Sequence, residues 1–135
     1  MAVWLILAAA LGLVAYVRLA PSVPARWHVA PLAEGPPGQV VAGEGSASLR
    51  LAGDGPALLA RLDAVALATP RTQRLAGSVA EGRITWITRS ALWGFPDYTT
   101  AEAGPEGLRV HARLRFGRGD MGVNAARLTD WLSRL

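Results

Sequence analysis

The sequence predicts an α+β protein in which an N-terminal transmembrane helix precedes a small antiparallel sheet with two helices packed on one face. Three observations lead to this prediction. Residues 1–17 carry no charged side chain, two later segments show apolar residues at helical spacing, and the remainder alternates between short apolar strands and tight turns. We expect about five strands, in the order strand, helix, four strands, helix. The 135 residues suffice for one small domain.

The predicted transmembrane anchor comprises residues 1–20. Its uncharged run is at the lower limit of a bilayer span of roughly 17–25 residues, and the aliphatic stem of Arg18 extends it. Trp4 and Tyr16 lie near its two ends, where amphipathic aromatic side chains favour the membrane interface. Pro21 then ends the helix. A cleaved signal peptide is the alternative, but such peptides typically have basic residues before the apolar run, and this chain has none there.

The charged residues constrain the partners and the orientation. All 14 basic residues are arginine, and the formal net charge of +4 suits an anionic partner such as phospholipid headgroups. It falls short of the charge of a nucleic-acid-binding tail, so no nucleic-acid partner is expected. Arg18 and Arg26 follow the span and nothing basic precedes it, which by the positive-inside rule favours a cytoplasmic domain. A domain on the other side of the membrane remains the alternative.

The segment after the anchor, residues 21–45, is predicted to be a linker. It is rich in proline and glycine, which disfavour both helices and central strands. The folded domain is predicted over residues 46–135. It begins with a strand, because Ala47, Leu49 and Leu51 alternate with more polar residues.

A helix is predicted over residues 55–67, with Asp54 as its N-cap and apolar residues at helical spacing. Three strands follow in "QRLAGSV", "ITWITRS" and "DYTTAEA", separated by turns. The last strand, "LRVHARLRF", alternates most regularly, with its apolar residues up to Phe116 facing the core. Because the helices are expected on that core face, the opposite face should be open and basic. It carries Arg109, His111, Arg113 and Arg115.

The stretch "RFGRGDMGVNAARL", residues 115–128, is interpreted as a turn that starts the last helix. Its glycines permit the positive φ angles of a tight turn, and Asp120 can accept hydrogen bonds from the first free amides of the helix. The side chain of Asn124 can bond back to the turn. An anion site is the alternative, because a glycine turn before a helix N-terminus can hold one and three arginines lie nearby.

The same stretch resembles the signature of the DUF1499 family, a bacterial domain of unknown function. The matching positions are Arg115, Gly117, Asp120, Met121, Gly122, Val123, Asn124 and Arg127. The upstream "SALWGFPDYTTAEA" also resembles the family, through Phe95, Asp97 and Tyr98. The resemblance covers about residues 46–135. This chain lacks the family's Asn-Cys-Val-Ser-like segment and has "ARLR" where many members have Ser-Ala-Ser-Arg. The resemblance implies a bacterial protein and supplies no reaction; with the predicted anchor, it leads us to expect a protein of the bacterial inner membrane.

Catalytic machinery is not visible in the sequence. The two histidines are far apart, cysteine is absent, and no metal cluster or cofactor motif is present, so we expect neither metal nor cofactor. We therefore expect a non-enzymatic module that binds an anionic lipid, a small ligand or another envelope protein. Its candidate binding residues are Arg109, Arg113, Arg115, Asp120, Asn124 and Tyr98. The alternative is an enzyme with a small cleft around Asp97, Tyr98, Arg115 and Asp120.

Overall fold

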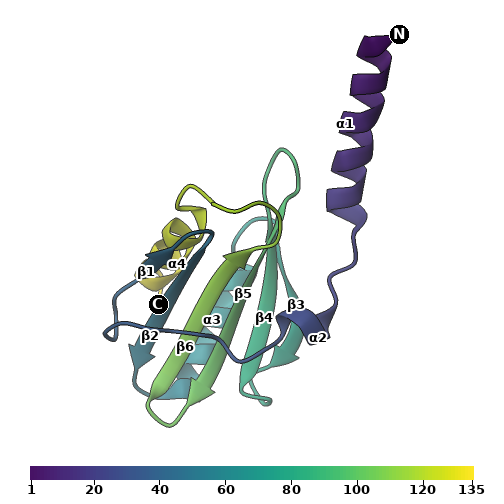
Figure 1. Ribbon diagram of the computed structural model, residues 1–135. Coiled ribbons are helices and arrows are strands. Elements are labelled where there is room, and N and C mark those ends of the chain that lie inside the picture. The colour runs from purple at the N-terminus through teal and green to yellow at the C-terminus, as the bar shows by residue number, and fades with distance from the viewer.

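The computed structural model describes residues 1–135 and confirms the α+β class (Figure 1). Helix α1 stands apart from a sheet that carries two helices on one face and a chain segment on the other. The helices are α1 (Ala2–Leu19), α2 (Pro24–Trp27), α3 (Gly55–Leu67) and α4 (Val123–Ser133). The strands are β1 (Val41–Gly43), β2 (Ser46–Ala52), β3 (Thr72–Ser78), β4 (Arg83–Arg89), β5 (Pro96–Gly104) and β6 (Gly107–Leu114).

The sheet has six antiparallel strands in the order β1-β2-β6-β5-β4-β3. The predicted meander is confirmed, since β3 to β6 pair in sequence order through short turns. The predicted count of about five was one short. The additional strand, β1, lies inside the segment predicted as a linker and pairs with β2 through the register Val41↔Ser48.

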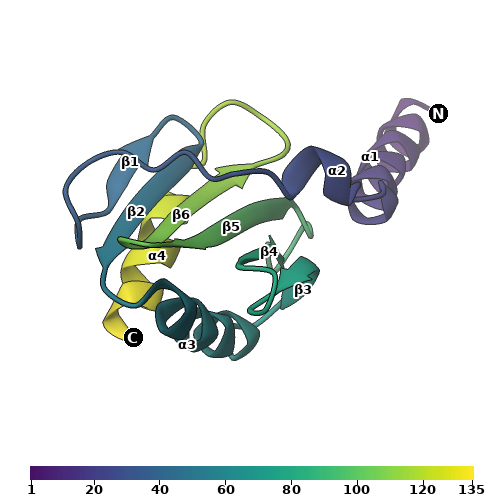
Figure 2. The same ribbon diagram turned by 90° about the horizontal axis from the view of Figure 1, so that it is seen from below.

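Helices α3 and α4 pack side by side on one face of the sheet (Figure 2). The bounds of α3 agree with the prediction, and Asp54 caps it by accepting a hydrogen bond from the Ala57 amide at 3.1 Å. The main core lies between these helices and the sheet, where Trp86 of β4 meets Trp131 of α4 edge to face at 5.8 Å. This layer buries the apolar stripes that the sequence predicted.

One buried carboxylate organises the centre of this core. Asp63 of α3 accepts a hydrogen bond from the Trp86 indole N–H at 2.9 Å and forms an ion pair with Arg74 of β3. A buried acid is stable only where such partners compensate its lost hydration. The pair therefore fixes α3 across strands β3 and β4.

The other face of the sheet is not open, which corrects the prediction. Residues 24–32, which we call the strap, cross it (Figures 1 and 2). Trp27 of the strap stacks on Tyr98 of β5, with ring centroids 3.9 Å apart and an interplanar angle of 11°. The next residue, His28, bonds through Nδ1 to the Thr85 hydroxyl at 2.8 Å. The hydroxyl of Thr100 donates to the Trp27 carbonyl at 3.2 Å. Both faces of the central strands are therefore covered.

The end of the last strand differs from the prediction as well. Strand β6 ends at Leu114, so Phe116 lies in the following turn and does not face the main core. Its ring contacts Tyr16 of α1 edge to face, with centroids 6.0 Å apart, and Phe95 at 6.4 Å. The pattern of alternating apolar residues extends to Phe116, beyond the end of the strand, because Phe116 takes part in a second, smaller apolar cluster.

The strap is expected to contribute substantially to stability. Truncation of Trp27, which is 5% exposed, by Trp27→Ala removes the stack on Tyr98. Large buried aromatic truncations cost about 3–5 kcal/mol. We expect a loss of that size in the free energy of unfolding of the full chain, measured by urea titration in an uncharged detergent. The half-exposed Trp93 supplies the control, since Trp93→Ala should cost less than about 0.5 kcal/mol. Equal losses in both variants would show that the strap does not hold the fold.

Candidate functional site: the base of the N-terminal helix

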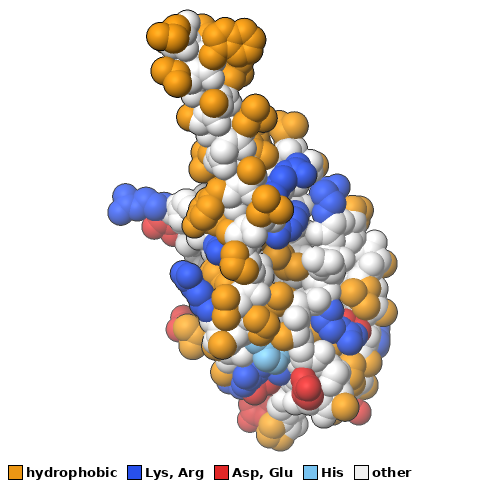
Figure 3. Space-filling model, turned by 90° about the vertical axis from the view of Figure 1, so that its right-hand side faces the viewer, with side chains coloured by type: hydrophobic (Ala, Val, Ile, Leu, Met, Phe, Trp, Pro, Cys, Tyr) orange, Lys and Arg blue, Asp and Glu red, His pale blue; other side chains and the backbone are white.

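Helix α1 projects from the domain as an isolated apolar rod. Its 18 residues have a mean hydropathy of 2.1, and it is long and apolar enough to cross a membrane. Figure 3 shows hydrophobic side chains on the projecting helix and basic side chains gathered where it meets the domain. A helix that is apolar all round has no stable place in water, so it requires an apolar environment.

The base of α1 is fixed to the domain by its last turn. Val17 is 2% exposed, and its carbonyl lies 3.4 Å from the guanidinium of Arg89 at the end of β4. Arg18 donates to the Leu92 carbonyl at 3.1 Å in the loop that follows β4. The edge-to-face contact of Tyr16 with Phe116 adds an apolar contact. The direction of the helix relative to the sheet is thus set by specific contacts.

These contacts all lie at one end of the sheet, which we call the anchor end. Here β3 begins, β4 ends, β5 begins and β6 ends, as the registers Thr72↔Thr88, Arg89↔Pro96 and Asp97↔Leu114 show. The two loops at this end expose large apolar side chains. They are Leu92, Trp93 and Phe95 in the loop between β4 and β5, and Met121 in the turn before α4.

Two of the candidate binding residues connect the anchor to the sheet. The guanidinium of Arg115 donates to the Pro21 carbonyl and to the Tyr98 hydroxyl, each at 3.1 Å. Because arginine can only donate, the Tyr98 hydrogen is free to bond the Ser22 hydroxyl, 2.6 Å away. Tyr98 itself is 1% exposed. The observed contacts of both residues are therefore structural: they tie residues 21 and 22 to β5.

The other two candidate arginines have separate surroundings. Arg113 lies with its guanidinium 4.8 Å from the centroid of the Trp27 ring, a cation–π contact that holds the strap. Burial, together with the charge of Arg26, lowers the pKa of Arg113. Arg109 lies nearer the opposite end of the sheet and forms an ion pair with Glu102 at 3.3 Å. The predicted basic face is thus partly covered and partly neutralised.

Asp120 and Asn124 form the turn that the sequence predicted. Asp120 accepts hydrogen bonds from the amide of Gly122 at 2.9 Å, and from the amide and side-chain nitrogen of Asn124 at 3.0 and 2.8 Å. Burial alone raises the pKa of Asp120, but these hydrogen bonds together outweigh it and hold that pKa below its usual value. The helix begins two residues later than predicted, with Gly122 as its N-cap, but the Asp120 carboxylate still accepts the Asn124 amide of the first helical turn.

A buried polar chain continues from this cap. Arg127 donates to the Asn124 side chain and forms an ion pair with Asp97 of β5 at 3.1 Å. Burial raises the pKa of Asp97, and the opposing effect of Arg127 does not fully cancel it. The chain joins α4 to the start of β5 at the anchor end.

The four residues of the enzyme hypothesis are divided between the two faces of the sheet. Asp97 and Asp120 connect to α4, whereas Tyr98 and Arg115 connect to the strap side. Successive residues of a strand point to opposite faces, so Asp97 and Tyr98 cannot line one cleft. The arrangement does not form the open cavity that this hypothesis requires.

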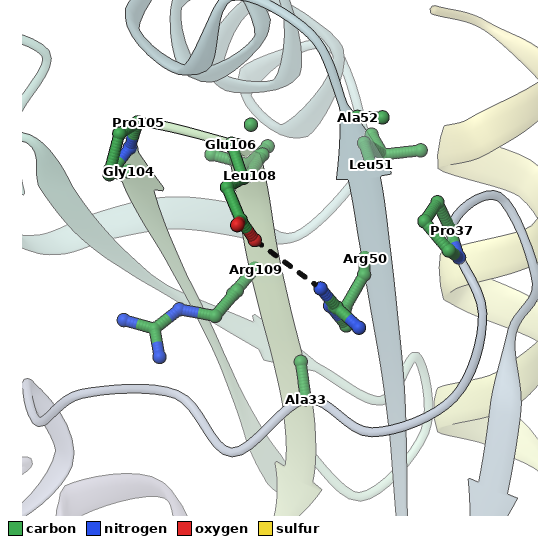
Figure 4. Close-up of a pocket in the computed structure, with 11 residues that line it drawn as sticks. Ala33, Pro37, Arg50, Leu51, Ala52, Gly104, Pro105, Glu106, Leu108 and Arg109 are labelled. Atoms are coloured by element: carbon green, nitrogen blue, oxygen red, sulfur yellow. Dashed lines mark ion pairs between the residues drawn. The ribbon is translucent and has the colours of Figure 1, made fainter.

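Two pockets lie elsewhere. One, of about 520 Å³, is at the end of the sheet opposite α1, beside the hairpin between β5 and β6 (Figure 4). Its two arginines are neutralised: Arg50 faces Glu106 at 3.8 Å, and Arg109 pairs with Glu102. The other, of about 380 Å³, is at the anchor end and is lined by Arg18, Arg71 and Arg89 without any acid.

The sequence analysis did not identify this second group of arginines. Positions 18, 71 and 89 come from a helix, a turn and a strand end, and no spacing connects them. The only available signal was local, since Arg18 ends an apolar run and Arg71 follows a proline.

The geometry of the site does not identify a protein family, but comparison with known proteins does. The chain matches the family described as "Protein of unknown function (DUF1499)" over residues 30–135. The chain belongs to the DUF1499 family. The match covers the strap from residue 30, the whole sheet and both packed helices, and it excludes α1. No curated protein and no solved structure matches the chain.

The cap of the DUF1499 signature is expected to be pH-sensitive. Asp120→Ala removes three hydrogen bonds and should cost about 0.5–2 kcal/mol at pH 7. Because the folded pKa is lowered, this stability is complete above the unfolded pKa of about 3.9 and is lost as the pH falls through the folded value.

Urea titrations of wild type and variant across this acid range measure the difference. The difference between wild type and Asp120→Ala should shrink below about pH 4. Asp130→Ala, which removes an exposed carboxylate paired with Arg134, is the control and should cost less than about 0.5 kcal/mol. A difference for Asp120→Ala that stays constant across the acid range would contradict the capping role of the ionised carboxylate.

Proposed function

We propose that this DUF1499 protein is a single-pass protein of the bacterial inner membrane and that its domain is a binding module held against the membrane surface. The observation that carries the proposal is the docked base of α1. An apolar helix of membrane-spanning length is joined to the domain by the buried Val17 and by hydrogen bonds of Arg18 and Arg89, and the surrounding loops expose apolar side chains. We propose residues 1–20 as the anchor; residues 21–45, predicted as a linker before a domain at 46–135, include the strap and strand β1 and are therefore packed on the domain.

These contacts also favour retention of the anchor over its removal as a signal peptide. Cleavage after Ser22 would remove Val17 and Ala20, which are both buried, and would separate Ser22 from the following chain. It would leave Arg89 and Arg115 without their carbonyl partners in residues 17–21. A segment intended for removal does not need to complete the packing of the mature domain.

The contacts at the anchor end also determine the proposed orientation of the domain relative to the membrane. If α1 crosses the bilayer, the loops at the anchor end lie at the level of the headgroups. Exposed Leu92 and Trp93 then enter the interface, where aromatic side chains are favoured, and arginines meet anionic lipid at about 1 kcal/mol each. The excess of arginine after the span favours the cytoplasmic side.

The binding module is favoured over an enzyme because the side chains proposed for catalysis are already committed to structural contacts. Asp120 bonds helix amides and Tyr98 is packed under Trp27. The partner classes of this proposal are a lipid, a small ligand and another envelope protein, and the arginine-rich anchor end favours an anionic one.

The anchor is tested by alkaline carbonate extraction of membranes that contain the full chain. We expect the chain to stay with the membranes, and a variant that lacks residues 1–20 to be released, because no other helix can span a bilayer. The intact mass of the purified chain provides the second measurement. A mature chain beginning at Val23 or Arg26, or full release by carbonate, would overturn the proposal.

The side of the membrane is tested separately. A C-terminal fusion to a reporter that fluoresces only in the cytoplasm should be bright, and a fusion to a phosphatase that is active only outside should be inactive. The opposite pair of results would place the domain on the outer side.

A further inference from the structure

We propose that the pocket lined by Arg18, Arg71 and Arg89 binds the phosphate group of an anionic membrane lipid. This inference rests on the proposed function, since a lipid reaches the pocket only if α1 lies in a bilayer. The pocket, of about 380 Å³, lies between the last turn of α1, the start of β3 and the end of β4. We call it the arginine pocket.

The charge of the arginine pocket is uncompensated. No aspartate or glutamate lines it, and every carboxylate–guanidinium pair in the molecule uses other arginines. Three guanidinium groups around one hollow repel each other, and a bound anion removes that repulsion. The positive charge of the pocket therefore favours the binding of an anion.

The three guanidinium groups are held in place by backbone carbonyls. Arg18 donates to Leu92 at 3.1 Å, Arg89 to Gly94 at 2.9 Å, and Arg71 through Nε to Arg89 at 3.0 Å. A guanidinium has five N–H donors, so each retains several for a ligand. Fixed guanidinium groups with free donors match the paired oxygens of a phosphate.

The backbone at the pocket is strained in a way that favours a functional role. Arg71 has a φ of 57°, a left-handed conformation that non-glycine residues seldom adopt. Glycine or asparagine would adopt it more easily. Such strain persists where the surrounding structure enforces it, and it clusters at ligand sites. Arg71 lines the pocket from the turn between α3 and β3.

The position of the pocket selects a lipid over a soluble phosphate. Arg18 is in the last turn of α1, where a spanning helix leaves the hydrocarbon and meets the phosphate layer. The loop that lines the pocket through Ser90, Ala91 and Gly94 also contains Leu92 and Trp93, which are 73% and 51% exposed. Apolar side chains beside a phosphate site suit a molecule that joins a phosphate to acyl chains. A soluble phosphate ester gains nothing from the exposed apolar side chains of this loop.

The test uses the full chain in an uncharged detergent, titrated with short-chain phosphatidylglycerol, short-chain phosphatidylcholine and inorganic phosphate. Binding is measured by calorimetry. We expect phosphatidylglycerol to bind about tenfold or more tightly than either of the other two, since only it combines net charge with acyl chains.

The decisive variant is Arg18→Gln with Arg71→Gln. It leaves Arg89 in place, so the contact with Val17 is retained. The matched control is Arg50→Gln with Arg109→Gln, which removes the same charge from the pocket at the other end of the sheet. We expect the first variant to lose about tenfold or more in affinity for phosphatidylglycerol and the second to stay within about twofold.

Each result supports or overturns the proposal. Equal losses in both variants would show a general charge effect and overturn the site. Inorganic phosphate that binds as tightly as the lipid would assign the arginine pocket to a soluble phosphate and overturn the lipid. Unchanged lipid binding by the Arg18→Gln, Arg71→Gln variant in a chain that still resists carbonate would overturn this inference and leave the proposed function standing. Near-ultraviolet circular dichroism of both variants verifies that they are folded.

Discussion

The stack of Trp27 on Tyr98, completed by the Tyr98 hydroxyl, is the contact on which the arrangement of the molecule depends. The ring is covered by the strap, and its hydroxyl bonds Ser22 and Arg115. Without it, the chain after α1 would be a proline-rich tether, and the helix could take any direction. With it, residues 20–27 are held to β5, and the helix leaves the sheet at a fixed place. A buried hydroxyl with two partners specifies one geometry, because any other leaves a polar group unsatisfied.

Because α1 leaves the domain at a fixed place, one end of the sheet lies beside the helix and the other lies away from it. The arginines at the two ends have different partners. At the far end, arginine is compensated: Arg83 and Arg109 share Glu102, and Arg50 faces Glu106. At the anchor end, Arg18, Arg71, Arg89 and Arg115 contact only carbonyls, a hydroxyl or an aromatic ring. The net charge of +4 is therefore distributed unevenly. Figure 3 shows basic side chains near the base of the helix, and others lower on the same face that lie beside acidic side chains.

Most of the fold could be predicted from the sequence, because local patterns determine it. The alternation of β6, the helical spacing of α3 and the N-cap Asp54 are properties of neighbouring residues. Strand β1 was missed because three residues cannot show an alternation, and its pairing depends on the hairpin around Gly45. The strap was missed for a related reason. The sequence shows an apolar Trp27 among prolines, but only the folded sheet shows that Tyr98 lies beneath it.

In the candidate site, too, contacts between residues close in sequence could be predicted, whereas contacts between residues far apart in sequence could not. Asp120 and Asn124 are close in sequence, so their hydrogen bonds could be predicted, and the structure confirms them. The arginine pocket combines three distant positions, and no residue pattern could reveal it.

The electrostatics of the arginine pocket argue that its ligand belongs to the membrane. Guanidinium groups without acidic partners repel each other, and this repulsion grows as the dielectric constant of the surroundings falls. If α1 lies in a bilayer, as proposed, the arginine pocket is close to low-dielectric hydrocarbon, where the repulsion is stronger than in solution. The proposed position at the membrane therefore increases the stabilisation that a bound anion provides. Headgroup phosphates are the anions present at that depth, so insertion of the helix and occupation of the pocket favour each other.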